Sequence, residues 1–472
     1  MVKHQEVGDW LDERQQRFVN ISDQIWGFAE VALAETKSCQ LQAEDLEADG
    51  FRITRNVGGL PTAFVAEWGE GSPVIGFLGE YDALPDLSQK NQAAQEQLVA
   101  GGAGHGCGHN LLGTASLAAA SALKAWLQET GRSGTVRYYG CPAEETGAGK
   151  VFMARAGAFD GLDAAITWHP GSSISAMRGS SLAIDHATFR FFGKTSHAAG
   201  APELGRSALD AVELMNIGVN FLREHIIEAA RIHYVITNGG GQPNVVPAEA
   251  EVWYYIRAPR RDLVDPITKR VLAIANAAAA MTETRVEVHD LYGIHNFLPN
   301  QTLATLAMGV LDELGPMEFT AEEEAFAREV SDAFGEAARI RALERSGLPK
   351  EMKDRVLLTE PVQPTDEGKT MSGSTDVAEA SWNAPTVQVT TTCWALGAAG
   401  HSWGVTATGA MSIGHKGMMH AAKAMAITAA QLFDDPELLQ KAKDEFTTST
   451  DGYTYEAPIP EGTEPPKPHI RS

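Results

Sequence analysis

The sequence has few features that would cross-link the chain or anchor it. Only four of its 472 residues are cysteine, which is too few and too scattered for a disulfide framework. The opening "MVKHQEVGDWLDERQQ" is charged and lacks the apolar core of a signal peptide. The longest apolar stretch, residues 115–126, is short for a bilayer span and contains Lys124. We therefore expect a cytoplasmic protein with no membrane partner.

Positive charge is also scarce. Lys and Arg number 38 against 61 Asp and Glu, which gives a net charge of −23. A surface of this sign does not attract nucleic-acid phosphates or anionic lipid. We expect no nucleic-acid partner, and we interpret the acidic surface as an aid to solubility.

The length exceeds what a single hydrophobic core usually holds, so we expect two domains. Short β-rich runs alternate with helical segments over residues 51–170 and again after 295, which is typical of an α/β domain with a mostly parallel central sheet. Residues 181–295 instead show a β-α-β-β-α-β order, typical of a small α+β unit. We therefore predict a catalytic domain from residues 1–180 and 296–472, with a smaller domain, 181–295, inserted into it.

The sequence also predicts the conformation of two further segments. The charged run over residues 321–345 is predicted to form one solvent-exposed helix. The last twenty or so residues are rich in proline and are expected to wrap the surface or to remain loose.

Residues able to bind a metal follow several predicted strands, where open α/β sheets place their sites. In chain order they are Asp82 in "EYDALP", Cys107 and His109 in "HGCGHN", Glu144 and Glu145 in "PAEETG", His169 in "WHPG" and His401 in "GHSW". Thiolate, imidazole and carboxylate groups all bind divalent cations. A second carboxylate beside a ligand could take a proton from a metal-activated water and deliver it to a leaving amine.

Other interpretations of single residues stay open. Cys107 could be a small buried residue, or a nucleophile activated by His105 or His109. The glutamate pair could be solvated, and His169 could simply cap a strand. Only the metal interpretation accounts for all the strand-end residues together. Trp168, Trp394 and Trp403 lie near these loops and could stack on an aromatic substrate or pack in the core.

Taken in order, the motifs "EYDALP", "GHGCGHN", "PAEETGAG", "WHPG", "GKTSHAA", "GGGQPNVVPAEAEVWYYIRAP" and "GHSW" resemble those of the aminoacylase/carboxypeptidase superfamily of dimetal amidohydrolases. The resemblance covers nearly the whole chain. It is nearest to the branch of hippurate, indole-acetyl-amino-acid and p-aminobenzoyl-glutamate hydrolases, and within it to the B-subunit type of the last group.

The resemblance implies a metal-dependent hydrolase of N-acyl or N-aroyl amino acids with two divalent ions, which could be Zn, Mn, Co or Ni. It implies these metal ligands: Cys107, His109, Glu145 as the bridging ligand, His169 and His401. Glu144 would be the general base and acid, and Asp82 would orient a histidine ligand. The inserted domain would be a lid or dimerisation domain, in which His197 stabilises the oxyanion across a dimer and Asn244 and Arg257 hold the substrate carboxylate.

Two departures from the family pattern leave alternatives open. Asn110 and Leu112 replace a carboxylate and an imidazole, and the surroundings of His401 are unusual, so His415 competes with it as the last ligand.

A dipeptidase, or one subunit that depends on a related partner chain, is the alternative function. A homodimer or larger assembly through the inserted domain is expected from the resemblance.

Overall fold

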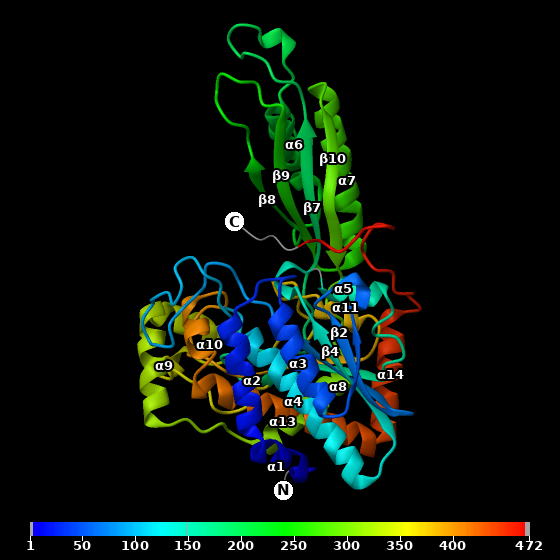
Figure 1. Cartoon of the computed structure of the whole chain (residues 1–472), viewed down its shortest axis with the longest axis vertical. Helices are drawn as coiled ribbons and strands as arrows, with labels where there is room; N and C mark the ends of the chain where they lie inside the picture. The colour runs from blue at the N-terminus through cyan, green and yellow to red at the C-terminus, as the bar shows by residue number, and fades with distance from the viewer. Residues whose placement is uncertain (1–2, 148, 468–472) are drawn as a thin grey trace.

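The computed structural model describes residues 3–147 and 149–467, and these form two lobes (Figure 1). The small lobe contains the strands and helices of residues 183–294, and the large lobe contains the rest. Each lobe is built on its own sheet. Within the described residues, no helix is both long and apolar enough to cross a membrane.

The sheet of the large lobe has seven strands in the order β1-β2-β4-β3-β5-β11-β6. They are β1 (Arg52–Arg55), β2 (Phe64–Glu70), β3 (Val74–Glu80), β4 (Gly134–Cys141), β5 (Ala164–Gly171), β6 (Ser175–Ala176) and β11 (Thr386–Thr392). The four central strands β4, β3, β5 and β11 run parallel, and the outer strands are antiparallel. The predicted α/β fold class is confirmed.

Helices cover both faces of this sheet. They are α1 (Gln5–Glu13), α2 (Gln15–Phe28), α3 (Thr36–Ala48), α4 (His109–Thr130), α5 (Gly149–Arg155), α8 (Gln301–Leu314), α9 (Ala321–Phe334), α10 (Glu336–Arg345), α11 (Val377–Ser381), α12 (Trp403–Thr408), α13 (Ser412–Asp434) and α14 (Pro436–Thr450). Neighbouring residues of a strand point to opposite faces. Phe77 of β3 accordingly packs in the core that contains α4 and α13, and Leu78 packs in a separate core with α5 and α11.

The small lobe has four antiparallel strands in the order β10-β7-β9-β8. These are β7 (Ala183–Phe192), β8 (Arg231–Asn238), β9 (Glu249–Ala258) and β10 (Arg285–Ile294), with helices α6 (Ala208–Leu222) and α7 (Arg261–Met281) packed on the sheet. Their apolar side chains form a core of their own. The order of elements is the one predicted, and the domain boundaries at residues 180 and 295 stay a prediction.

The charged insert differs from its prediction. Residues 321–345 form two helices, α9 and α10, rather than one. Gly335 separates them with a φ of 87°, a left-handed conformation that glycine adopts without the steric penalty of a side chain.

The segment after α14 crosses the junction of the lobes, where it is drawn in red (Figure 1). Gly293, next to the end of β10, donates its N–H to the carbonyl of Pro458 at 2.8 Å. The Tyr455 hydroxyl donates to Glu379 of α11, a fully buried carboxylate that also accepts the backbone N–H of His295 at 2.7 Å. The tail therefore wraps the surface and ties the exit from β10 to the large lobe.

We predict that Tyr455→Phe lowers the stability of the chain by about 1–3 kcal/mol, because it leaves a buried acceptor on Glu379 without one of its donors. The measurement is the midpoint of urea unfolding. Tyr453→Phe is the matched control, since Tyr453 is 44% exposed and water can replace its hydroxyl at His295. Equal midpoints for the two variants would contradict the role assigned to Tyr455.

Candidate metal centre and active site

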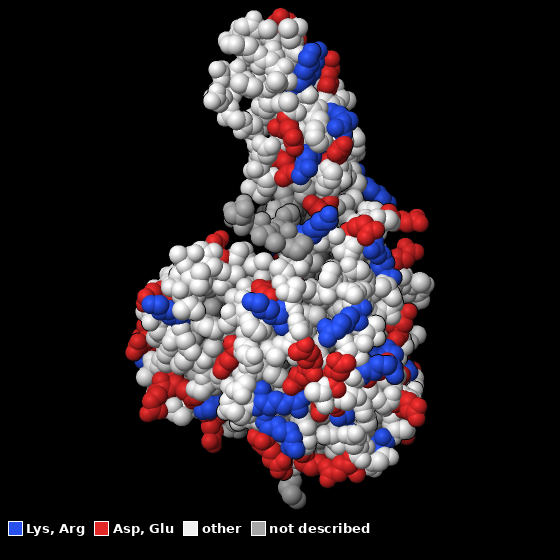
Figure 2. Space-filling model, viewed as in Figure 1, with Lys and Arg blue, Asp and Glu red and all other residues white. Residues whose placement is uncertain are grey.

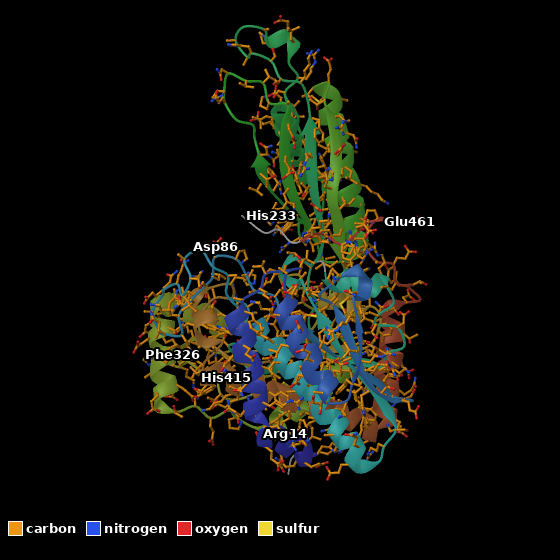
Figure 3. All side chains as sticks on the ribbon, in the orientation of Figure 1. Arg14, Asp86, His233, Phe326, His415 and Glu461 are labelled. Atoms are coloured by element: carbon orange, nitrogen blue, oxygen red, sulfur yellow. The ribbon has the colours of Figure 1, made fainter. Side chains whose placement is uncertain are left out.

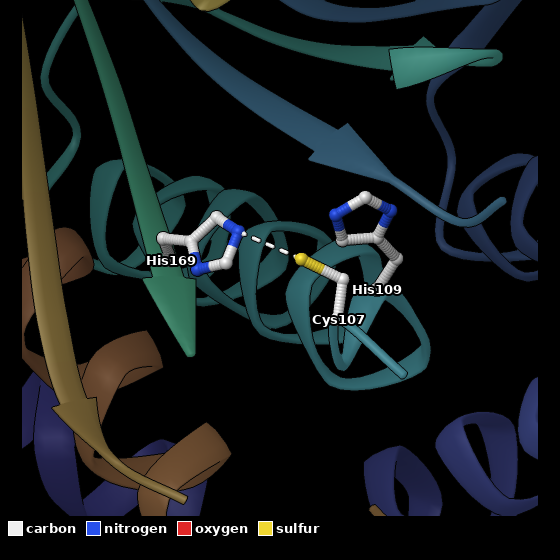
Figure 4. A group of neighbouring side chains, drawn as sticks. All are labelled: Cys107, His109 and His169. Carbon is white, nitrogen blue, oxygen red and sulfur yellow. Dashed lines mark hydrogen bonds between the residues drawn. The ribbon is translucent and has the colours of Figure 1, made fainter. Parts of the chain in front are cut away.

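The structure brings the five predicted metal ligands to one place. Cys107, His109 and His169 offer ligand atoms that lie within 4.8 Å of one another (Figure 4). Cys107 also forms such a group with Glu145 and His401. The Cys107 thiol is therefore the donor common to both groups, whereas Glu145 belongs to only one of them.

Short contacts define both groups. The Cys107 Sγ lies 3.4 Å from Nε2 of His169, as the dashed line in Figure 4 shows. The Nδ1–H of His169 can donate to the carbonyl of Pro170, 2.8 Å away, which leaves Nε2 free to act as a ligand. In the other group, Nε2 of His401 lies 3.3 Å from the Glu145 carboxylate.

The backbone explains why these loops meet. Gly108, the N-cap of α4, has a φ of 77°, and a Cβ there would lie 3.2 Å from the ring of Pro170. A glycine is thus required where the chain turns between Cys107 and His109. His401 follows β11, and its backbone N–H donates to the carbonyl of Gly106 at 2.8 Å. This bond joins the two ligand loops directly.

Asp82 lies where the sequence predicts it, against a ligand histidine. Its Oδ1 accepts from Nδ1 of His109 at 2.9 Å, and its Oδ2 accepts from the backbone N–H of Glu145 at 2.9 Å. Burial opposes the charge of Asp82, but the hydrogen bond and charge of His109, the N–H of Glu145 and the charge of Lys150 together outweigh burial and lower the pKa of Asp82. One carboxylate thus fixes a histidine ring and the glutamate loop together.

The donor set fits divalent cations. Nε2 of His109 and Oε1 of Glu145 are buried and lack a hydrogen-bond partner, which is costly unless something else satisfies them. Burial raises the pKa of the Cys107 thiol to about 12 and that of Glu145 to about 7. Thiol, imidazole and carboxylate donors around shared space are what zinc-like ions bind.

The raised pKa of the Cys107 thiol argues against a role of Cys107 as a nucleophile. Reactive thiols need a lowered pKa, which a cationic neighbour provides. Here burial dominates and outweighs the contribution of His109, which acts in the opposite direction.

Glu144 lies beside the ligands on the short 3-10 turn Glu144–Thr146. Its Oε2 is 3.9 Å from Nε2 of His109, and Glu80 is 3.4 Å from the same nitrogen. Burial, and then the negative charge of Glu80, raise the pKa of Glu144 well above its usual value. A carboxyl group of this kind can hold a proton near neutral pH.

Sequence reasoning missed a buried ion-pair system below the site. Lys150 of α5 is fully buried, its Nζ lies 2.6 Å from Glu80, and it also pairs with Asp376. The backbone N–H of Lys150 donates to Asp376 at 2.8 Å. A lysine in the otherwise apolar helical run "GKVFMA" was the available signal.

A cavity of about 590 Å³ opens above the ligands, in the size range of small-molecule sites. It is lined by Cys107, Glu144, Glu145, His169 and His401, together with Arg257 from the end of β9. Nε of Arg257 is buried without a hydrogen-bond partner.

Two predicted residues do not reach this cavity. His197 and Asn244 lie on exposed loops of the small lobe, where the N–H of Ala198 donates to the carbonyl of Asn244 at 3.0 Å. They neighbour each other but do not line the cavity of their own chain.

The competing histidines and the tryptophans have other contacts. His415, labelled in Figure 3, lies 2.8 Å from Asp23 and is in neither ligand group. His105 is buried, with Nε2 3.0 Å from the carbonyl of Ile25. Trp168 and Trp394 are buried in the core, and Trp403 stacks on Phe334. None of the three tryptophans lines the cavity.

Several known proteins are similar to this chain in sequence or in fold. A family model described as "Peptidase family M20/M25/M40" matches residues 76–460. The B-subunit of the p-aminobenzoyl-glutamate hydrolase of Escherichia coli (strain K12) is 46% identical over 97% of this chain and 98% of the relative. The Xaa-Arg dipeptidase of Mus musculus is 35% identical over 66% of this chain and 72% of the relative.

A solved structure has the same fold. It is a dinuclear metal-binding peptidase of the M20 family from Bacillus subtilis, and it superposes with a TM-score of 0.54 at 19% identity over 90% of this chain and 99% of that one. The family match extends over most of the chain, and the Escherichia coli relative spans nearly all of it. The chain therefore belongs to peptidase family M20/M25/M40 and is a metal-dependent amidohydrolase.

Proposed function

We propose that the chain hydrolyses the amide bond of N-acyl amino acids, with N-aroyl-glutamates as the substrate class. The observation that carries this proposal is one cavity lined by Glu144, by Arg257 and by four of the five predicted metal ligands, Cys107, Glu145, His169 and His401. The relative that is 46% identical is named for p-aminobenzoyl-glutamate, an N-aroyl-glutamate.

In this proposal the residues of the two groups would hold the divalent cations. Cys107 would contribute with His109 and His169 in one group and with Glu145 and His401 in the other, whereas the resemblance implied Glu145 as the bridging ligand. When bound, such ions supply Lewis-acid polarisation of the amide carbonyl and a lowered pKa of water. The donor set suits Zn, Mn, Co or Ni.

The residues of the chain perform the proton transfers and hold the substrate. The Glu144 carboxylate takes a proton from the attacking water, and its raised pKa suits return of that proton to the leaving nitrogen. The guanidinium of Arg257, which forms no ion pair with a described residue, binds the α-carboxylate of the amino acid.

A second chain completes the site in this proposal. His197 is exposed and outside the cavity of its own chain, so it reaches substrate only from a partner. The edge strand β8 leaves Tyr234, Val235 and Ile236 between 38% and 53% exposed. Figure 2 shows a largely uncharged surface on this side of the small lobe. An edge of this kind suits pairing with a second copy, or with a related chain.

A dipeptidase activity is the second candidate. It is favoured by the Xaa-Arg dipeptidase, 35% identical to this chain. The two candidates differ in the acyl group, so comparing N-benzoyl amino acids with dipeptides, in the presence of Mn or Zn, separates them.

We predict that Glu144→Gln lowers kcat by on the order of 10²- to 10⁴-fold, because the amide cannot accept the proton of water. Metal content, measured by plasma mass spectrometry, should match that of the wild type. Glu129→Gln, on the exposed end of α4, is the control. Substantial activity in Glu144→Gln would remove Glu144 from this role.

We predict that Cys107→Ser weakens binding of divalent ions by at least the roughly 10- to 100-fold typical of losing a residue that only supports a ligand. Cys141→Ser is the control, since Cys141 is also buried but belongs to neither ligand group. Competition with a chelating dye measures the affinity. Unchanged affinity in Cys107→Ser would show that the thiol is not a ligand.

We predict that His197→Ala and Glu144→Gln are each inactive but complement each other when co-expressed. Random pairing yields roughly a quarter of wild-type activity, because half the dimers are mixed and each has one intact site. Activity no higher than that of the separate variants would contradict a contribution of His197 across a dimer.

A further inference from the structure

Helix α10 ends at the catalytic cavity. Its last residue, Arg345, lines the same cavity as Glu144 and His401. The helix belongs to the charged insert after α8, for which the sequence alone indicates no function.

The helix is held firmly at this position. Leu343 is fully buried in a small cluster with Leu358 and Leu396. Leu396 lies in the same loop as His401, and its carbonyl accepts a hydrogen bond from the Ser331 hydroxyl of α9. The insert is thus packed directly against the loop that carries a metal ligand.

Arg345 and Arg257 supply the only Lys or Arg side chains of the described cavity lining. Within residues 3–147 and 149–467, Arg345 forms no ion pair or side-chain hydrogen bond. Asp366 also lines the cavity, but its Oδ2 accepts from the backbone N–H groups of Arg178 and Gly179, at 3.1 and 2.8 Å. Its Oδ1 has no hydrogen-bond partner, and within the described residues no ion pair joins Asp366 to Arg345.

These two guanidinium groups are on different parts of the chain. Arg257 comes from the small lobe and Arg345 from the insert. The chain has a net charge of −23. Two guanidinium groups in one cavity, neither in an ion pair with a described residue, are therefore unusual in it. Guanidinium groups bind carboxylates through paired hydrogen bonds, so the cavity suits a ligand with two carboxylates.

We propose that Arg345 binds the side-chain carboxylate of the substrate and so selects N-acyl amino acids with acidic side chains. This rests on the proposed function, in which Arg257 binds the α-carboxylate. Arg345 is a specificity-determining residue here, since it is separate from the metal ligands and from Glu144.

The test compares N-benzoyl-glutamate with N-benzoyl-glutamine, which differ in one charge and hardly in shape. With the metal-loaded full chain, Arg345→Gln should lower the ratio of kcat/KM for glutamate over glutamine by about 10- to 100-fold, the range for a lost hydrogen bond to a charged group. The change should lie mainly in KM. Arg341→Gln is the control, because Arg341 is exposed on the same helix and does not line the cavity.

Charge reversal gives an independent measurement. Arg345→Glu should reverse the preference and favour N-benzoyl-lysine over N-benzoyl-glutamate, an effect that misfolding cannot produce. A ratio unchanged in Arg345→Gln, or equally lowered in Arg341→Gln, would overturn the assignment of Arg345 while leaving the proposed function intact. A metal-loaded wild type that hydrolyses neither benzoyl substrate would overturn both.

Discussion

Buried negative charge around His109 is the constraint on which the rest of this site depends. Glu80, Asp82 and Glu144 lie within a few residues of strand ends and face the His109 imidazole, and Glu145 follows Glu144 directly and lies 3.3 Å from His401. Grouped carboxylates raise one another's pKa and are costly to bury unless cations compensate them. Lys150 compensates Glu80 from below. Glu144 and Glu145 line the cavity, where divalent ions can balance their charge.

The parallel sheet makes this concentration of charge possible. The carboxyl ends of β3, β4, β5 and β11 lie along one edge, so loops from residues more than three hundred positions apart meet there. Short backbone contacts then fix the loops, such as the bond from His401 to Gly106 and that from Glu145 to Asp82. Hydrogen bonds of the main chain therefore fix the positions of the ligand loops, in addition to any constraint from bound metal.

Much of this arrangement could be predicted from the sequence, because strand-end position and residue type are local properties. The fold class and the meeting of Cys107 with His169 and His401 followed from them. Lys150 and Asp376 were missed because their pairing joins residues 226 positions apart and leaves no local pattern. The break at Gly335 was missed because the charged helical pattern continues across it. The role proposed for His197 depends on a second chain and came from the family resemblance, since strand-end position and residue type do not indicate it.

The roles proposed for the two arginines also reconcile an acidic protein with the proposed anionic substrate. A net charge of −23 opposes long-range attraction of carboxylates. At physiological ionic strength, however, exposed charges are screened beyond about 8 Å, so distant surface acids contribute little inside a half-enclosed cavity. In the proposed function, the local guanidinium groups of Arg257 and Arg345 attract the anionic substrate there. Because Arg257 belongs to the small lobe and Arg345 to the insert, the proposed recognition of a dicarboxylate would require both parts to be positioned against the ligand loops. The tail that ties β10 to α11 helps fix the small lobe in that position.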